Sequence, residues 1–402
     1  MRISTQQTFN TSLRSMLDQQ ARLQQSEQQI ASGLRVLKPS DDPSAAVRSV
    51  NLEGNIAVIK QYSSNAAAAE SQLSLEESVL GNVGNILQRA RELNVQAVND
   101  TNSPQSRAAI ATELRERLDE LLSLANTRDA AGEYIFGGYS VGAQPFVASG
   151  GSASYGGDQG QRLLQVGEGT QVAVRDSGAE VFELIPSGNG RIEALPDGAN
   201  TGTLVVGAYS AGGNYVPDNY TISFTQALPT DPITYSVTDG GGPPVVVASG
   251  TWQVGDDIQF NGAQLSFSGV PADGDSVTVT DAGKRSVFDS LDALASALEM
   301  STPSGVSSAQ QHNAMNRALN ELDQALTHVN EVRAAVGSRL NIVDSQRSIN
   351  QDFDLQLQTA LSENRDLDYA EAISRFNSQL TSLQAAQQAY VKVQELSLFK
   401  FL

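Results

Sequence analysis

Narrow apolar stripes at both ends of the chain constrain its fold more than any other feature of the sequence. Near the N-terminus, apolar side chains recur at alternating spacings of four and three, on seven of nine positions: Phe9, Leu13, Met16, Gln20, Leu23, Glu27, Ile30, Leu34 and Leu37. Two apolar positions per heptad form a coiled-coil seam, whereas a helix on a globular core carries a broader apolar face. The first arm of the chain therefore needs a partner helix.

The C-terminal arm has the same character. Residues 306–362 are predicted to form one helix, roughly 85 Å long at 1.5 Å per residue, and a last helix is predicted over 369–398. The apolar positions of the last arm are Ile373, Phe376, Leu380, Leu383, Tyr390, Val393, Leu396, Leu398, Phe399 and Leu402. Neither arm has an apolar face wide enough for a core of its own. The two arms should pair, and the apolar residues of both stripes form the predicted assembly interface.

Helix boundaries are marked by proline and by capping residues. Lys38-Pro39 should end the first helix, and Asp42 followed by Pro43 has the pattern of an N-cap before the first helical residue. Asp41 and Asp42 could also be an acid/base pair or a metal site, but carboxylates at a helix N-terminus explain them better. The second helix should continue to about residue 97.

Four further segments complete the predicted order of elements. A third helix is expected over 104–131, a short one over 287–298, and a break over 363–367. The residues between 132 and 285 are rich in Gly, Pro, Thr, Val and Asp, with strand candidates at 221–224, 235–238, 245–247 and 277–280. The fold class is therefore α+β, with long helical arms from both termini and an inserted antiparallel β sandwich or partial barrel. Residues 138–157 are expected to be a loose hinge into the insert.

Composition argues against several classes of function. The formal net charge of −19 disfavours nucleic acid and anionic membranes as partners. The chain has no cysteine, and its two histidines, His312 and His328, lie sixteen residues apart on a predicted helix. Zinc sites and Cys/His nucleophiles are thereby excluded. We expect no enzyme and no cofactor. Neither a signal peptide nor an apolar run of membrane-spanning length is visible.

Periodicity alone leaves the mode of association open. A two-stranded coiled-coil dimer and a subunit of a polymer both fit the stripes. So do relatives of phage tails, adhesins and secretion needles.

Short motifs on both arms resemble those of the flagellin family. The N-terminal signature comprises Gly33-Leu34-Arg35 and then Asp41-Asp42-Pro43 within residues 38–46, and residues 95–103 are similar to the end of the second flagellin helix. On the other arm, residues 333–341 and 366–372 fit the same family. The resemblance covers both arms, which make up over half of the chain, and covers the insert poorly.

Two features favour the hook–filament junction members of this family over flagellin itself. Pro43 stands where flagellins usually have alanine, and the segments 383–393 and 396–402 look like the C-terminus of the junction members. Flagellin remains the alternative within the family. An alternative from another class is a surface-displayed module that binds glycans or host molecules through Trp252, Tyr209, Tyr215, Tyr220 and Tyr235.

The resemblance implies three domains and a set of partners. Residues 1–42 with 366–402 would form inner-tube helices, 43–140 with 286–365 a helical bundle, and 141–285 a β-rich outer domain. The implied partners are hook-associated protein 1, flagellin, other copies in a ring, and an export chaperone at the C-terminal helix. Type III export to the extracellular hook–filament junction is implied as well. Because the seams are narrow, we expect residues of about 1–40 and 365–402 to be disordered in the monomer and to fold on assembly.

Overall fold

The computed structural model describes residues 5–99, 102–228, 230–302 and 304–398. The chain divides into two compact units, of which the first comprises Met1–Asn65 with Gln346–Leu402 and the second Ala66–Ser345. Two long helices, α2 (Pro43–Ala97) and α5 (Gly305–Arg365), contribute residues to both units. The predicted α+β architecture, with helical arms flanking an antiparallel β insert, is confirmed.

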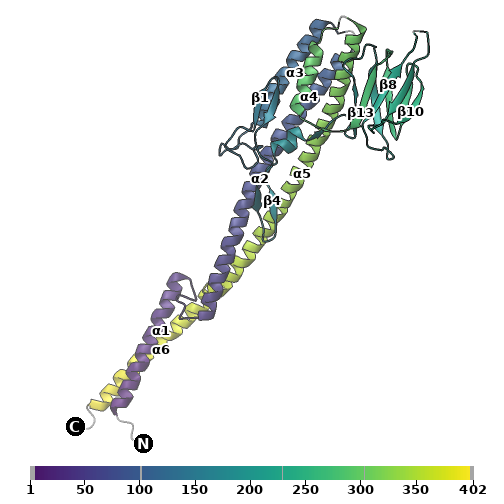
Figure 1. The fold of residues 1–402 in the computed structure, drawn as a ribbon. Coiled ribbons are helices and arrows are strands. Elements are labelled where there is room, and N and C mark those ends of the chain that lie inside the picture. The colour runs from purple at the N-terminus through teal and green to yellow at the C-terminus, as the bar shows by residue number, and fades with distance from the viewer. Residues whose placement is uncertain (1–4, 100–101, 229, 303, 399–402) are drawn as a thin grey trace. The chain divides into compact units, whose positions relative to one another are not determined.

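The first unit contains an antiparallel pair of helices, α1 (Thr5–Ser32) and α6 (Tyr369–Leu398), which lie side by side (Figure 1). The predicted start of α2 at Pro43 and the predicted extent of α6 are confirmed. The first helix ends earlier than Lys38-Pro39. Gly33 has a φ of +71°, and the next residue leaves the helix to form a β-bridge with Asp366.

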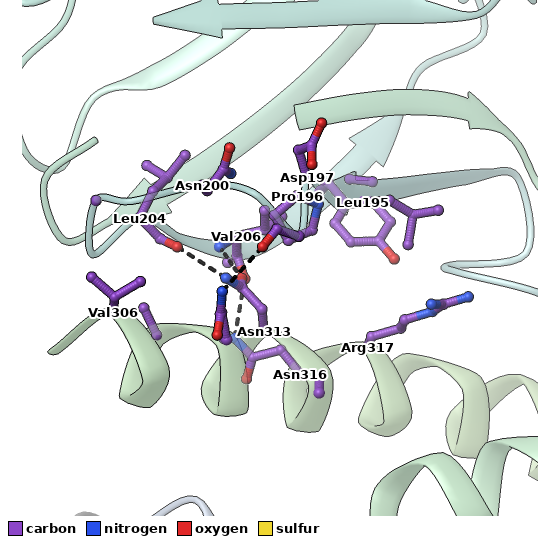
Figure 2. A pocket seen from close by; sticks show the side chains of 18 of the residues that line it. Leu195, Pro196, Asp197, Asn200, Leu204, Val206, Val306, Asn313, Asn316 and Arg317 are labelled. Atoms are coloured by element: carbon purple, nitrogen blue, oxygen red, sulfur yellow. Dashed lines mark hydrogen bonds between the residues drawn. The ribbon is translucent and has the colours of Figure 1, made fainter. Parts of the chain in front are cut away.

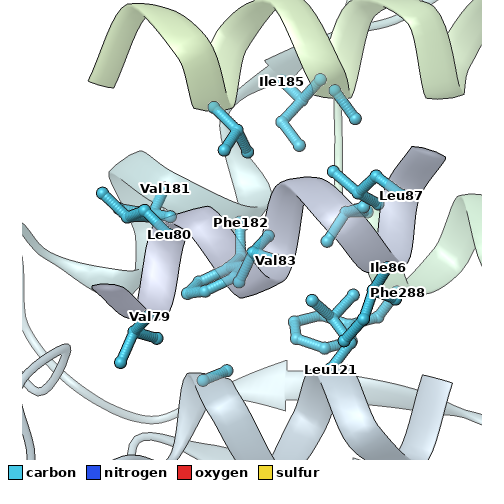
Figure 3. Packing of buried hydrophobic residues seen from close by; sticks show 14 of the residues in the cluster. Val79, Leu80, Val83, Ile86, Leu87, Leu121, Val181, Phe182, Ile185 and Phe288 are labelled. Atoms are coloured by element: carbon cyan, nitrogen blue, oxygen red, sulfur yellow. The ribbon is translucent and has the colours of Figure 1, made fainter. Parts of the chain in front are cut away.

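The helices of the second unit enclose a continuous apolar core. It joins α2 and α5 to α3 (Pro104–Ala125) and α4 (Val287–Glu299). Figure 3 shows Ile86 of α2 beside Phe288 of α4 and Leu121 of α3. The third helix stops at Ala125 rather than near residue 131, and the side chain of the next residue, Asn126, bonds the main chain of Phe146.

The segment between α3 and the outer β domain packs on these helices. It contains two hairpins and a short π-helical turn: β1 (Phe146–Ser149), β2 (Ser152–Tyr155), β3 (Leu163–Gln165), β4 (Gln171–Ala173), η1 (Ala179–Glu183) and β5 (Ile185–Pro186). Phe146 is fully buried, with its ring 5.4 Å from that of Phe182 and 5.1 Å from that of Phe288. The expectation of a loose hinge over 138–157 is therefore wrong.

The outer β domain has a core of its own, built from the facing sides of two antiparallel sheets. A five-stranded sheet has the order β10-β9-β8-β13-β6, and a three-stranded sheet the order β11-β12-β7 (Figure 1). The strands are β6 (Ile192–Pro196), β7 (Val205–Ala211), β8 (Tyr220–Thr225), β9 (Thr234–Thr238), β10 (Val246–Thr251), β11 (Asp257–Phe260), β12 (Ala263–Ser268) and β13 (Ser276–Asp281). The short β14 (Lys284–Arg285) pairs with β5 where the chain returns to the helices.

Buried side chains place the change from helical to β packing near residue 190. Residues up to Ile185 share the helical core, and the core of the outer domain begins at Ile192. The predicted three-domain division, with boundaries at 42, 140, 285 and 365, remains a prediction.

Side chains of α5 cap the edge of β7 and attach the outer domain to the helices (Figure 2). Asn313 accepts a hydrogen bond of 2.7 Å from the Val206 N–H and donates one of 2.9 Å to the Leu204 oxygen. Asn316, one turn further on, donates to the Val206 oxygen at 3.0 Å. A cavity of about 410 Å³ remains between α5 and the adjoining strands of the β domain. An otherwise open strand edge is thus occupied within the chain.

Candidate assembly interface

The inner seam of α1 and α6 is built from apolar residues seven positions apart. Met16, Leu23 and Ile30 of α1 are partly buried, as are Phe376, Leu383 and Tyr390 of α6. The register of the pair is given by Ser26, whose hydroxyl donates to Gln379 Oε1 at 2.9 Å. These six residues belong to the predicted interface, and the heptad spacing sets them on the faces that the two helices turn toward each other.

Other predicted interface residues lie on the outside of the pair. Leu13 is 38% exposed, Ile373 47% and Leu380 36%. The neighbouring apolar side chains Leu17, Tyr369 and Val391 are more than half exposed. The pair therefore has a second set of apolar side chains that remain partly exposed in the described part of the chain. Phe399 and Leu402 lie outside the described residues, as do the side chains of Phe9, Val393, Leu396 and Leu398.

Large apolar residues are also exposed on the parts of α2 and α5 that belong to the first unit. They are Val47, Val50, Val58, Ile349, Phe353 and Leu355. These residues were not predicted, because the heptad stripe of the α5 segment was followed only to Val343: Met315, Leu319, Leu322, Leu326, Val329, Arg333, Val336, Leu340 and Val343. The sequence contains a signal for these exposed residues. The positions that continue the heptad stripe after Val343 are polar, namely Arg347, Asn350 and Asp354, and apolar residues stand beside them. Asn350 is 1% exposed, so the usual arrangement of polar and apolar residues is reversed here.

The helix pair is joined to its neighbours in the same unit by main-chain hydrogen bonds around Gly33. The Leu367 N–H donates to the Gly33 oxygen at 2.9 Å, and the Arg35 N–H donates to the Arg365 oxygen at 2.8 Å. These two bonds flank the bridge between Leu34 and Asp366. Leu34 and Leu37 are partly buried in this segment rather than in a helical seam.

The family motif residues form a polar junction next to this bridge. Arg35 donates to the Asn364 oxygen at 2.6 Å and pairs with Asp42 at 3.4 Å. Asp42 caps α2 by accepting from the Ala45 N–H at 2.9 Å, and Pro43 is the first helical residue, as predicted. The bonds from the Ala45 N–H and the Ser44 hydroxyl hold the pKa of Asp42 below its usual value.

Asp41 accepts from two main-chain N–H groups, those of Leu37 and Lys38, at 3.2 and 3.0 Å. Both carboxylates are therefore used in a turn and a helix cap, which supports the structural interpretation of the pair. Asn364, which is 9% exposed, was not predicted as part of this junction. Its contacts are with residues more than 300 positions earlier, so no local pattern could have revealed it.

Reactive constellations are absent from the part of the chain that the structure describes. There, no three His, Asp or Glu side chains lie close enough together to hold a metal ion. His328 is bonded to the main-chain oxygen of Glu180 at 2.6 Å. None of the described helices combines the length and the apolar character needed to cross a membrane.

Comparisons with known proteins agree with the motifs. Residues 3–141 match the bacterial flagellin N-terminal helical region, and residues 319–402 match the bacterial flagellin C-terminal helical region. The chain is 28% identical over 403 residues to flagellar hook-associated protein 3 of Escherichia coli, covering 100% of this chain and 99% of that protein.

Solved structures extend the likeness to the fold. The crystal structure of Xanthomonas campestris FlgL is 32% identical, has a TM-score of 0.72, and covers 77% of this chain and 99% of that chain. The hook-associated protein 3 of Legionella pneumophila is 33% identical, with a TM-score of 0.73 and coverage of 78% and 97%.

These relatives are structural proteins, and the chain is not an enzyme. The match to both terminal helical regions, together with near-complete coverage of the relatives, confirms the interpretation of the motifs. The chain belongs to the flagellin family, within its hook-associated protein 3 (FlgL) group.

Proposed function

We propose that this protein is a structural subunit of the hook–filament junction, where it assembles through its paired terminal helices and joins hook-associated protein 1 to flagellin. The observation that carries the proposal is the set of exposed apolar side chains on the first unit, among them Leu17, Val50 and Phe353. Exposed large apolar side chains are a feature of protein interfaces when they are contiguous. Similarity to hook-associated protein 3 supports the place in the flagellum.

Assembly is coupled to folding of the terminal segments. The seam of α1 and α6 alternates apolar levels with polar ones such as Ser26 and Gln379, so pairing within one chain buries little apolar surface. Residues of about 1–40 and 365–402 are disordered in the free subunit, because this burial does not offset the entropy of ordering about 78 residues. Neighbouring copies supply the missing contacts in a ring. The terminal helices form the inner tube, the helical bundle surrounds them, and the β domain faces outward.

Export precedes assembly. The subunit leaves through the flagellar type III apparatus, and a dedicated chaperone holds the C-terminal helix until then. The apolar residues of α6, which include Ile373 and Leu380, are the surface that such a chaperone would cover in the cytoplasm.

Limited proteolysis and substitution test the coupling. Protease should trim soluble monomer at both ends to one stable core, and termini that resist protease in the monomer would contradict the mechanism. Leu383→Asp or Ile30→Asp should abolish assembly while the β domain stays folded, since each places a charge in the seam. Normal motility of a strain that carries either variant would count against the seam.

Position in the flagellum separates this proposal from the flagellin alternative. A label on the β domain should give one band at the hook–filament boundary in electron micrographs, and deletion should release unpolymerised flagellin into the medium. A filament subunit would instead be labelled along the whole filament and secreted in bulk.

The β domain offers little for the glycan-binding alternative. Trp252 is 3% exposed, Tyr215 7% and Tyr220 1%, and all three belong to the core of the domain. The Tyr209 hydroxyl accepts from Asn320 of α5 at 3.3 Å. Aromatic rings that stack on sugars need an exposed face, so no specific observation favours this function.

A further inference from the structure

The apolar residues of the helix pair determine its axial register only in part. Met16, Leu23 and Ile30 repeat every seven residues in α1, and Phe376, Leu383 and Tyr390 do so in α6. Because the two repeats are equal, sliding one helix past the other by one heptad would again align apolar residues at two of the three levels. A chain that orders these segments only on assembly must select the register by other contacts.

One polar pair inside the seam distinguishes the registers. Ser26 is 4% exposed, and its hydroxyl donates to Gln379 Oε1 at 2.9 Å across 353 residues of sequence. One heptad before and after Gln379, the corresponding positions of α6 are Ala372 and Ala386. Sliding α6 in either direction would therefore place Ser26 opposite an alanine, and the buried hydroxyl would lose its acceptor.

The partner of Gln379 would also change in a shifted register. Sliding in one direction brings it to the level of Gln19, which could replace the hydrogen bond, and in the other to the level of Gly33, which could not. The bridge at Leu34 and Asp366 holds the base of the pair through main-chain atoms, which every residue carries. The hydrogen bond between Ser26 and Gln379 thus favours the observed register through the identity of the two side chains.

We propose that Ser26 and Gln379 are the specificity-determining pair that fixes the register of α1 on α6 during assembly. This inference rests on the proposed function, in which these segments become ordered only in the assembled flagellum. A polar residue in a coiled-coil seam characteristically reduces stability and specifies the alignment. Correct alignment sets the level at which outer residues such as Leu13 and Leu380 meet neighbouring copies.

Cysteine cross-linking can read the register directly, because the chain contains no cysteine. Gln29 and Arg375 touch at 3.4 Å on the surface of the pair, so Gln29→Cys with Arg375→Cys reports the observed register. Gln29→Cys with Ser382→Cys, and Arg22→Cys with Arg375→Cys, report the two registers shifted by one heptad. Each full-length reporter replaces the wild-type chain in cells, and isolated flagella are treated with a short bismaleimide. Intramolecular cross-linking is then quantified by mass spectrometry.

With Ser26 and Gln379 intact, the in-register reporter should cross-link at least tenfold more than either shifted one. Ser26→Ala with Gln379→Ala should reduce this ratio to less than twofold. The swapped pair, Ser26→Gln with Gln379→Ser, should restore it, because it again places a hydroxyl opposite a side-chain amide. The matched control is Gln24→Ala with Ser378→Ala, which removes the same two residue types from exposed positions and should leave the ratio unchanged.

An unchanged ratio in the double alanine variant would overturn the proposal. If that variant does not enter flagella, Ser26→Val with Gln379→Leu keeps the seam filled and is read in the same way. Failure of the parent chain to enter flagella would contradict the proposed function instead. The same reporters, applied to the purified chain, would then test the register without assembly.

Discussion

Asn364, near the end of α5, donates its side-chain amide to the main-chain oxygen of Ala45 in the first turn of α2, at 2.8 Å. The same amide reaches the Ser49 hydroxyl at 2.7 Å, and the main-chain oxygen of Asn364 accepts from Arg35 at 2.6 Å. One buried side chain therefore connects the two arms of the chain through residues that are 319 positions apart in the sequence. The contact lies next to the segments that link α1 to α2 and α5 to α6. The exposed apolar residues of the first unit depend on this junction for their placement.

Asn364→Ala should destabilise the junction by about 1–3 kcal/mol, because it removes two hydrogen bonds and leaves the Ser49 hydroxyl buried without its donor. Thermal unfolding of the purified chain and the yield of chain in isolated flagella measure the effect. The control is Asn55→Ala, at an exposed position of α2, where no change is expected. Equal melting curves for the two variants would show that the junction contributes nothing to folding.

Gly33 is required by its backbone conformation and by its neighbour. Its φ is +71°, and a Cβ added there would lie 2.9 Å from the Tyr369 hydroxyl oxygen. Gly33→Ala should destabilise the ordered segment around Gly33 by about 1–2 kcal/mol, because alanine disfavours the left-handed conformation. The close contact with the Tyr369 hydroxyl destabilises it further. Assembly into flagella should fall accordingly, and Tyr369→Phe in the same chain should recover only part of the loss.

Gly54 supplies the matched control for this substitution. It lies inside α2, its backbone is helical, and a Cβ added there would meet nothing within 4 Å beyond its chain neighbours and the backbone of its own helix. Gly54→Ala should therefore be neutral or stabilise the chain by up to about 1 kcal/mol. If Gly33→Ala behaves like Gly54→Ala, the bridge between Leu34 and Asp366 does not depend on the glycine.

Local sequence patterns were sufficient to predict most helices and the β character of the insert. The start of α2 at Pro43, the length of α5 and the start of α6 follow from caps, proline and heptad spacing. Four strand candidates also correspond to β8, β9, β10 and β13. These features depend on residues close together in sequence, and a single sequence is therefore sufficient to predict them.

Contacts between distant residues could not be predicted in this way. Burial of Phe146 among Phe182 and Phe288 turned an expected hinge into part of the helical core. The seam predicted for α1 included Leu13, yet Ser12 and Gln19 are the more buried positions, because the pairing with α6 sets the face. Two apolar stripes of seven-residue period overlap on α1. Only the position of α6 shows which stripe faces the partner helix and which faces outward.

Ile373 tests the outer surface of the helix pair separately from its seam. Its side chain is 47% exposed, so Ile373→Asp should leave the stability of the free chain within about 0.5 kcal/mol. Incorporation into flagella should fall at least tenfold, since burying a charge against apolar neighbours is unfavourable. Ser374→Asp adds the same charge at the next exposed position and should reduce incorporation less. Equal incorporation of the two variants would contradict an interface at Ile373.

A buried carboxyl group makes the stability of the second unit depend on pH. Glu76 is 1% exposed and accepts from the Asp176 N–H at 3.0 Å, while Arg339 pairs with the Asp176 carboxylate at 2.9 Å. The second carboxyl oxygen of Glu76 is buried without a hydrogen-bond partner in the described part of the chain. Burial, followed by repulsion from Asp176, raises the pKa of Glu76 to about 8.

A raised pKa means that the folded chain holds a proton that the unfolded chain releases near its ordinary pKa of 4.5. The free energy of unfolding should therefore decrease as pH rises from about 5 to about 8, by at most ~1.4 kcal/mol per pH unit from this group, and then level off. Glu76→Gln keeps the shape and removes the titration. Its melting temperature should vary less with pH over this window and exceed that of the wild type at pH 8. Glu331→Gln, at an exposed position of α5, should retain the wild-type slope. A slope that Glu76→Gln leaves unchanged would mean that Glu76 is already ionised in the folded chain.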